Sequence, residues 1–272
     1  MFSLKNKVIV LFGGNGYLGK NFCKALLEND AILYSCDINT SQDPVIVDLQ
    51  EKYGERYYLK NVNAANKEEL LALKNELLEK YHRVDVLINS TTSKGNDFYL
   101  PFEEVSLEGW EIGLKGNLTV PFLTIQAFIP AMRQQRSGSI INISSIYGIL
   151  GNDQSIYKGS NLHEIYVKDS PNIKQIYSHG VYNAAKGGLV NFTRYLAAYY
   201  GKYNVRINTI TPGGIYYPLE NKTFNKKYSA KVPLGRKANP DEINGALVFL
   251  ASEASSYITG HNLIVDGGYS IW

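Results

Sequence analysis

Val8-Ile9-Val10-Leu11-Phe12-Gly13-Gly14-Asn15-Gly16-Tyr17-Leu18-Gly19 is the stretch that decides the fold of this 272-residue chain. Its apolar first half predicts a buried strand, and residues 17–29 continue with the apolar spacing of a helix. Glycines at 13, 16 and 19 permit a tight turn, close approach of the backbone to a pyrophosphate, and close packing of helix on strand. The helix N-terminus would offer its free N–H groups and positive dipole end to the phosphates. The stretch therefore predicts a dinucleotide-binding turn; a glycine-rich turn without a ligand is the alternative.

The rest of the chain repeats this alternation of strand and helix. Further strands are predicted at residues 31–36, 56–62, 84–89, 139–144, 205–211 and 263–265, and helices at 67–81, 118–135, 181–200 and 240–251. Such alternation is typical of an α/β fold: a Rossmann-type, doubly wound parallel sheet of about seven strands with helices on both faces. No repeat or linker divides the chain, so residues 1–272 are predicted to form a single domain. The stretches at about 153–179 and 214–236 do not fit the alternation and are predicted to be substrate loops.

Composition narrows the classes of partner. The formal net charge of +3 is too small to predict nucleic acid or an anionic membrane as a partner. We find no stretch that reads as a membrane span and no signal peptide, so we expect a cytoplasmic protein. Cys23 and Cys36 lack metal-ligand spacing and are predicted to be reduced, packed thiols, and no metal site is predicted.

Asp37 ends the second predicted strand, shortly after the glycine-rich turn. A carboxylate at this place can accept hydrogen bonds from a ribose 2′-hydroxyl and would repel a 2′-phosphate. No Arg or Lys stands immediately beside it. The residue therefore favours NAD over NADP, although a strand-end aspartate can also serve only as a turn former.

Tyr182 and Lys186 stand four residues apart, so on a helix they share one face. An ammonium fixed beside a phenol favours the phenolate and lowers its pKa from about 10. Upstream, the predicted strand that ends near Ser144 and Ser145 supplies hydroxyl groups. Alone, the pair is weak evidence, and an amphipathic helix that packs its tyrosine and solvates its lysine is the commoner explanation.

Taken in order, these motifs resemble the short-chain dehydrogenase/reductase family, and the resemblance covers nearly the whole chain. It rests on Gly13 to Gly19, Asp37, Asn89, Asn117, Ser145, Tyr182 with Lys186, Pro212-Gly213, Pro233-Leu234-Gly235-Arg236, Ile258-Thr259-Gly260-His261 and Val265-Asp266-Gly267-Gly268. The resemblance implies an oxidoreductase that interconverts a secondary alcohol and a ketone with a nicotinamide cofactor.

The resemblance also implies a catalytic set of Asn117, Ser145, Tyr182 and Lys186. Tyr182 would exchange the substrate hydroxyl proton, and Lys186 would lower its pKa and bind the nicotinamide ribose. Ser145 would hold the substrate oxygen and is chosen over Ser144 by its spacing from Gly148. Asn117 would order a water that relays protons through Lys186. Hydride loss from an alcohol leaves a developing carbonyl, which needs donors at its oxygen and a base for its proton.

Cofactor contacts follow from the same resemblance. They are assigned to Gly13, Asn15, Gly16, Tyr17, Leu18, Gly19, Asp37, Asn61, Val62, Asn89, Ser90, Thr91, Tyr182, Lys186, Pro212, Gly213 and Ile215. The chain departs from the family pattern at Phe12, usually Thr, and at Asn61, usually Asp. Its glycine spacing is closer to the branch that acts on nucleotide sugars, whereas its catalytic pattern matches the shorter-chain branch.

Our expectations about the substrate come from the two long stretches at about 153–179 and 214–236. Ser145 and Tyr182 are separated by far more residues than is usual in the family, and the extra residues lie at about 153–179. We expect this insertion to form a pocket wall or an oligomer contact; a surface excursion is the alternative. The second stretch carries Lys222, Lys226, Lys227, Lys231 and Arg236 against only Glu220. Such cations suit an anionic carbohydrate, for example a sugar phosphate, unless the loop is simply solvated.

We therefore expect an NAD-dependent oxidoreductase acting on a sugar, sugar phosphate or related polyol. Two other functions stay open: a nucleotide-sugar epimerase or dehydratase with tightly bound NAD, and a catalytically silent NAD-binding regulator. The family resemblance implies a homotetramer, and an apolar tail ending in Trp272 fits a contact between subunits.

Overall fold

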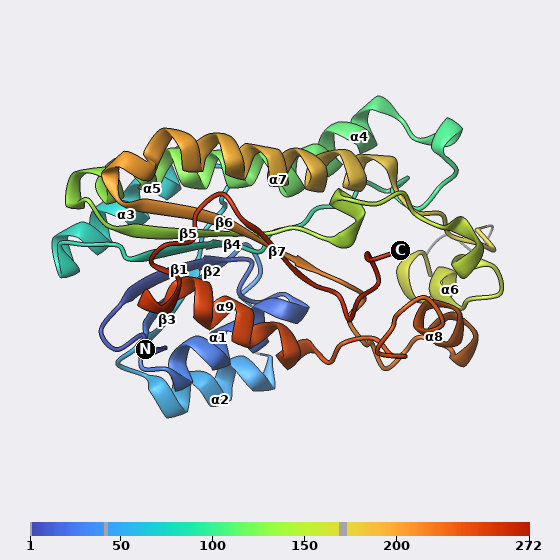
Figure 1. Ribbon diagram of the computed structural model, residues 1–272, viewed down its shortest axis with the longest axis horizontal. Helices are drawn as coiled ribbons and strands as arrows, with labels where there is room; N and C mark the ends of the chain where they lie inside the picture. The colour runs from blue at the N-terminus through green and yellow to red at the C-terminus, as the bar shows by residue number, and fades with distance from the viewer. Residues whose placement is uncertain (1, 41–42, 169–172) are drawn as a thin grey trace.

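One seven-stranded parallel sheet organises the molecule (Figure 1). The computed structural model describes residues 2–40, 43–168 and 173–272. The strands are β1 Val8–Phe12, β2 Ile32–Asp37, β3 Tyr57–Asn61, β4 Val86–Asn89, β5 Gly138–Ile143, β6 Val205–Pro212 and β7 Asn262–Val265. Their order is β3-β2-β1-β4-β5-β6-β7, and every neighbouring pair is parallel. This confirms the Rossmann-type doubly wound sheet, and the order reverses between β1 and β4, where ligands bind in such sheets.

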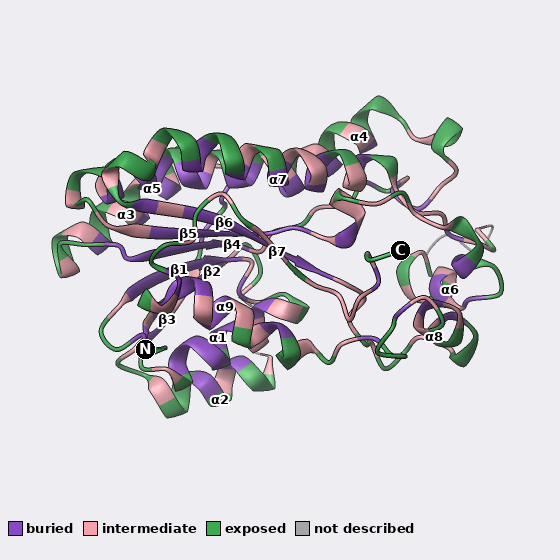
Figure 2. Ribbon diagram, viewed as in Figure 1, coloured by how far each residue is buried: buried purple, intermediate pink, exposed green. Residues whose placement is uncertain are grey.

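Helices cover both faces of this sheet (Figure 1). On one face lie α1 Tyr17–Glu28, α2 Pro44–Tyr53 and α9 Asn244–Ala251; on the other lie α3 Lys67–Tyr81, α5 Val120–Gln135 and α7 Gly180–Tyr200. Alternate residues of β1 pack on opposite sides, with Ile9 and Leu11 in the first core and Val8, Val10 and Phe12 in the second. The two-residue period of a strand explains why this fully apolar run is buried on both faces (Figure 2).

The sequence did not predict α2, although the signal for it is present. Asp43 precedes the helix and its side chain accepts from the Val45 N–H, while Pro44 occupies the first turn. An aspartate N-cap followed by proline is a helix start. Helix α3 has the predicted bounds of 67–81, and the predicted strands differ from the observed ones by at most two residues at either end.

The helix predicted at 118–135 is longer than expected. Helix α4 Leu107–Leu114, a π-helical turn Lys115–Thr119 and α5 run on without a break, so the helical segment begins well before residue 118. By length and composition alone, these 29 residues could cross a membrane, and the expectation that no stretch is so long and apolar is wrong. More than half of the apolar window is buried, and α5 contacts α3, β4 and β5, which accounts for its apolar residues.

The two long stretches meet beyond the carboxyl ends of the strands. They contain α6 Leu162–Tyr166 and α8 Lys222–Ser229, which Figure 1 shows beyond one end of the sheet, with the C-terminus beside them. A third apolar cluster joins them, with Ile156, Leu162 and Ile176 from one stretch and Phe224 and Tyr228 from the other. Residues 169–172 of the insertion lie outside the described residues.

Candidate active site

The glycine-rich turn is close-packed between β1 and α1. Gly13 has φ +83°, and a Cβ on it would lie 2.5 Å from the Ser90 carbonyl oxygen. A Cβ on Gly19 would collide with the Gly13 carbonyl. Gly16 precedes α1, and no side chain caps that helix, so its first N–H groups are open to an anionic ligand. The turn therefore fits a pyrophosphate.

Two adjoining cavities open on this turn. The first, about 430 Å³, extends over the ends of β5 and β6, and the second, about 540 Å³, lies beside the end of β2. Both are lined by Gly13, Gly16, Ser90, Thr91 and Thr92, so they form two halves of one groove across the point where the strand order reverses. A groove of this extent suits a dinucleotide, with the turn at its middle.

Asp37 lines the second cavity and is held in place by two backbone groups. One carboxylate oxygen accepts from the Asn15 N–H at 3.0 Å and the other from the Asn39 N–H at 3.0 Å. Each oxygen keeps further acceptor capacity for ribose hydroxyls. Among the described residues that line this cavity, the only cation is Lys115, which comes from the π-helical turn.

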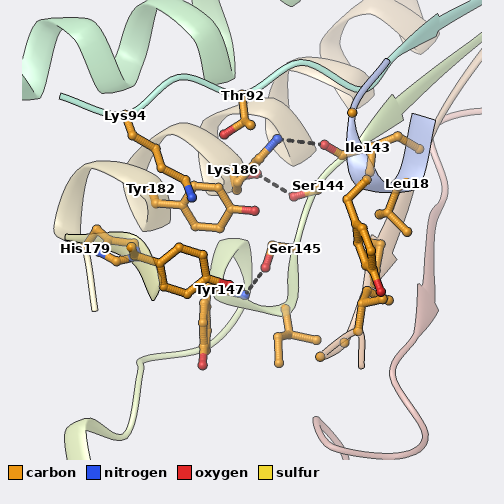
Figure 3. Close-up of a pocket in the computed structure, with 18 of the residues that line it drawn as sticks. Leu18, Thr92, Lys94, Ile143, Ser144, Ser145, Tyr147, His179, Tyr182 and Lys186 are labelled. Atoms are coloured by element: carbon orange, nitrogen blue, oxygen red, sulfur yellow. Dashed lines mark hydrogen bonds between the residues drawn. The ribbon is translucent and has the colours of Figure 1, made fainter. Parts of the chain in front are cut away.

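Ser145, Tyr182 and Lys186 line the first cavity (Figure 3). Tyr182 and Lys186 lie one turn apart on α7, and the Tyr182 hydroxyl points toward the serines that follow β5. Ser145 lies close enough to Tyr182 to act to lower the pKa of its hydroxyl, and Ser145 Oγ accepts from the Tyr147 N–H at 3.2 Å. Ser144 Oγ instead donates to the Lys186 carbonyl at 3.0 Å, so this serine braces the helix.

Lys186 is buried, and its Nζ donates to the Ile143 carbonyl at 2.9 Å. Burial lowers its pKa to about 8. Its Nζ lies 5.5 Å from the centre of the Tyr182 ring. The pKa of Tyr182 is nevertheless raised, because burial outweighs the effect of nearby Ser145. The structure of the chain by itself shows no lowering of this pKa by Lys186, because the ammonium is directed to the Ile143 carbonyl, so that role of Lys186 stays a prediction.

Asn117 lies in the π-helical turn, beneath the cavity rather than in its lining. Its Nδ2 donates to the Ser93 carbonyl at 3.0 Å and to the Gly113 carbonyl at 2.9 Å. Its Oδ1 is buried and has no protein partner. Pro121, four residues later, has no N–H to donate to the Asn117 backbone carbonyl. The amide oxygen is thus an acceptor suited to an ordered water.

Two of the predicted cofactor contacts line neither cavity. Asn89 is buried, with Nδ2 donating to Asn142 at 2.9 Å and Oδ1 accepting from Thr124 at 2.7 Å. Asn61 donates to the Ile38 carbonyl at 3.3 Å. Both side chains are used to hold strand ends, so their assignment to direct cofactor contact is not supported. All other predicted cofactor residues line one cavity or both.

The insertion forms part of the wall of the first cavity. Its side chains Tyr157, Leu162, Tyr166, Ile176 and His179 line that cavity. His179 stacks on Phe98 at 3.8 Å, and burial lowers its pKa to about 3, so this imidazole is neutral near pH 7.

The cations of the 214–236 stretch do not face either cavity. Lys231 pairs with Asp153 at 2.7 Å, and Lys227 donates to the carbonyls of Ser155 and Lys158 at 3.0 Å and 2.6 Å. Arg236 pairs with Glu242. Among the described residues, none of the five predicted cations appears in a cavity lining. The structure therefore gives no support to the argument from these lysines to an anionic substrate, because two of them hold the insertion instead.

Several lining residues were missed by the sequence analysis. Lys94, Phe98 and Tyr99 follow β4, and their only signal is a position in a loop at the carboxyl end of a strand. Glu220 and Lys237 form a nearly inaccessible ion pair at 2.5 Å in the same lining. The part of the chain that the structure describes holds no group of three side chains arranged to bind a metal ion.

Known proteins are similar to this chain in both sequence and fold. The family model described as short chain dehydrogenase matches residues 7–160, and the one described as Enoyl-(Acyl carrier protein) reductase matches residues 170–270. D-arabinitol 2-dehydrogenase (ribulose-forming) of Candida albicans is 30% identical, with 100% of this chain and 95% of that protein covered. Cyclopentanol dehydrogenase of Comamonas sp. is 28% identical, with 99% of each covered.

One solved structure is similar to the chain in both sequence and fold. It is a short chain dehydrogenase from Leptospira borgpetersenii serovar Hardjo-bovis with bound NAD+. It is 29% identical, covers 98% of this chain and 94% of its own, and superposes with a TM-score of 0.83.

Proposed function

The chain belongs to the short-chain dehydrogenase/reductase family, and from that premise we propose an NAD-dependent enzyme that interconverts a secondary alcohol and a ketone. The proposed substrate is a sugar, polyol or related hydroxylated molecule. One observation carries the proposal: Ser145, Tyr182 and Lys186 line a single cavity that continues into the pyrophosphate-sized turn. Two relatives named for the oxidation of secondary alcohols, D-arabinitol and cyclopentanol, support it.

The residues present fit a nicotinamide dinucleotide. The open N-terminus of α1 and the turn at Gly13 would hold the pyrophosphate, and Asp37 would hold the adenosine ribose. Lys186 would hold the nicotinamide ribose, and Ile215 lines the cavity where its backbone would face the carboxamide. Alcohol oxidation breaks one C–H and one O–H bond and forms C=O, with NAD+ taking the hydrogen from carbon as hydride.

The remaining chemistry belongs to the chain. The Ser145 and Tyr182 hydroxyls would hold the substrate oxygen, and Tyr182 would take its proton. Because the raised pKa keeps the Tyr182 hydroxyl protonated near neutral pH, its own proton must leave toward solvent as it takes the proton of the substrate. Lys186 and a water held by the unpartnered Asn117 amide oxygen would supply that route.

The preference for NAD over NADP rests on Asp37. Both carboxylate oxygens are oriented by backbone N–H groups, and an ionised carboxylate there would repel a 2′-phosphate. The bound NAD+ of the Leptospira relative supports the same preference. Exposed Lys115 is a competing feature, because it places a cation in the same cavity.

The test is NADH formation by the purified chain with a panel of polyols, sugars and cyclic alcohols that includes D-arabinitol and cyclopentanol. The proposal expects absorbance of NADH with at least one of them, and slower reaction when NADP replaces NAD. NAD binding without turnover of any secondary alcohol would contradict it and would favour a silent NAD-binding regulator.

A nucleotide-sugar epimerase or dehydratase remains the second candidate, because the glycines at 13, 16 and 19 follow that branch. Such an enzyme regenerates its cofactor in each cycle. It would retain NAD through purification and form no net NADH while converting a nucleotide sugar.

A further inference from the structure

Lys94 places an ammonium group in the first cavity, where the chemistry proposed above does not use it. It follows β4 in the chain and lines the cavity together with Tyr182 (Figure 3). Its Nζ lies 2.6 Å from the Tyr99 hydroxyl, to which it donates. The same Nζ lies 4.9 Å from the centre of the Tyr166 ring, 5.2 Å from that of Tyr99 and 5.9 Å from that of Phe98. Three aromatic rings therefore flank the ammonium, while Lys94 as a whole residue is exposed.

The ammonium has no carboxylate partner among the described residues. Lys237, the other lysine in the same lining besides Lys186, is neutralised by Glu220 at 2.5 Å. Burial alone lowers the pKa of Lys94, and no opposing charge restores it. Its side chain still meets solvent through the open cavity, so a ligand can reach the charge. A positive charge that is partly desolvated and uncompensated favours an anion.

The insertion builds this environment. Its Tyr166 stacks on Tyr99 with ring centres 5.3 Å apart, and its Tyr177 N–H donates to the Tyr99 carbonyl at 3.0 Å. Tyr99 in turn fixes the Lys94 ammonium. The segment that lengthens the chain between Ser145 and Tyr182 thus holds the residue that anchors the charge.

The ammonium also lies near the proton-transfer site. The Phe98 ring is 5.9 Å from Lys94 Nζ and 6.3 Å from the Tyr182 ring. Both side chains line this one cavity, which lets a single bound molecule present an oxygen to Tyr182 and another group to Lys94.

We propose that Lys94 binds a carboxylate of the substrate, so that the enzyme oxidises a hydroxy acid, such as a sugar acid, in preference to its neutral analogue. This inference rests on the proposed function of the same site. A carboxylate fits better than a phosphate because one ammonium with rings on its other sides offers few N–H donors. Phosphate sites commonly use an arginine fork or several donors.

The test compares acids with their uncharged amides. The probes are D-gluconate against D-gluconamide and 3-hydroxybutyrate against 3-hydroxybutanamide, with D-arabinitol as a neutral polyol. The kcat/KM of NADH formation is measured for wild type, Lys94→Met, Lys94→Arg and the control Lys226→Met, whose exposed lysine lies outside both cavity linings. Calorimetric titration of the NAD complex with each acid and amide supplies a binding readout that needs no turnover.

Wild type should prefer the acid of at least one pair, and Lys94→Met should lower its kcat/KM by roughly 10- to 100-fold while the amide changes little. Lys94→Arg should keep most of the preference and Lys226→Met all of it. Equal use of acid and amide by wild type would overturn the inference. So would an equal loss for acid and amide in Lys94→Met, since a purely structural lysine would act on both.

The two proposals fail in different ways. Oxidation of D-arabinitol with no acid preference removes the role of Lys94 and leaves the enzyme function standing. Acid-selective binding that depends on Lys94, with no oxidation of any probe, supports the carboxylate site and contradicts the oxidoreductase proposal. Absence of both acid-selective binding and turnover overturns both.

Discussion

Lys186, a residue of the proposed catalytic set, lowers the stability of the folded chain. Its folded pKa of about 8 lies below the ordinary 10.5 because the ammonium is buried. Between those values the unfolded chain binds more protons than the folded one, so this lysine makes stability rise with pH there. Below pH 8 the buried ammonium is charged and lowers the free energy of unfolding by its full amount, about 3 kcal/mol for a pKa shift of this size.

Lys186→Met should therefore stabilise the cofactor-free chain near neutral pH while abolishing turnover. The free energy of unfolding should rise by about 2 kcal/mol. Removing the buried charge returns about 3 kcal/mol, and the Ile143 carbonyl, left without its hydrogen bond, costs about 1 kcal/mol. Denaturant unfolding at about pH 7 and about pH 10 measures it, and the gap between variant and wild type should shrink at the higher pH. A variant less stable than wild type at the lower pH would contradict the assignment of the buried charge.

Asp37→Ala tests cofactor choice at the same scale. Removing the carboxylate deletes the ribose acceptor and the repulsion of a 2′-phosphate, so kcat/KM should fall roughly 10-fold with NAD and rise with NADP. Asp30→Ala, on an exposed aspartate in the turn before β2, is the control. An unchanged ratio of the two cofactors would show that Asp37 is only a turn former.

Among the elements, the insertion and the 214–236 stretch act as one unit. Asn161 Nδ2 donates to the Leu219 carbonyl and its Oδ1 accepts from the Asn221 N–H, both at 2.8 Å. These bonds join two segments that both line the first cavity.

Asn161→Ala should loosen that junction. We expect KM to rise roughly 3- to 10-fold with kcat little changed, because two hydrogen bonds that position the cavity wall are lost. Limited proteolysis within 214–236 should become faster. Asn96→Ala, on an exposed asparagine outside both segments, is the control; identical kinetics for the two variants would mean that the junction does not shape the site.

Elements built on local patterns could be predicted from the sequence, and elements built on distant contacts could not. The glycine turn, Asp37 and the Tyr182–Lys186 pair follow from spacing within one strand–helix unit. The lysines at 227 and 231 were misjudged because their partners lie far away in the chain. The aromatic enclosure of Lys94 depends on Tyr166, whose segment has no periodic pattern to place it.

At the scale of the whole molecule, one face carries exposed aromatic side chains. Phe122 on α5 and Tyr195 on α7 are 42% and 62% exposed, and Phe192 lies 6.3 Å from each ring. Such a row is costly in water and suits burial against another subunit. The tail residue Trp272 is also exposed, as a contact with a neighbour would require.

We predict that the chain forms a homotetramer that uses this face. Tyr195→Glu should shift the sedimentation profile toward smaller species, because an added charge would be buried at the contact. Tyr257→Glu, on a fully exposed tyrosine elsewhere, should not. A monomeric wild type would refute the prediction.

The central proposal is tested most directly by comparing wild type with Tyr182→Phe. With any secondary alcohol that wild type oxidises, the variant should lose roughly three orders of magnitude in kcat, since general acid–base catalysis contributes about that much. Its affinity for NAD, measured by calorimetry, should stay within about threefold, because the change removes one hydroxyl and keeps the ring. NADH formation by Tyr182→Phe at the wild-type rate, with NAD bound equally well, would contradict the assignment of proton transfer to this tyrosine.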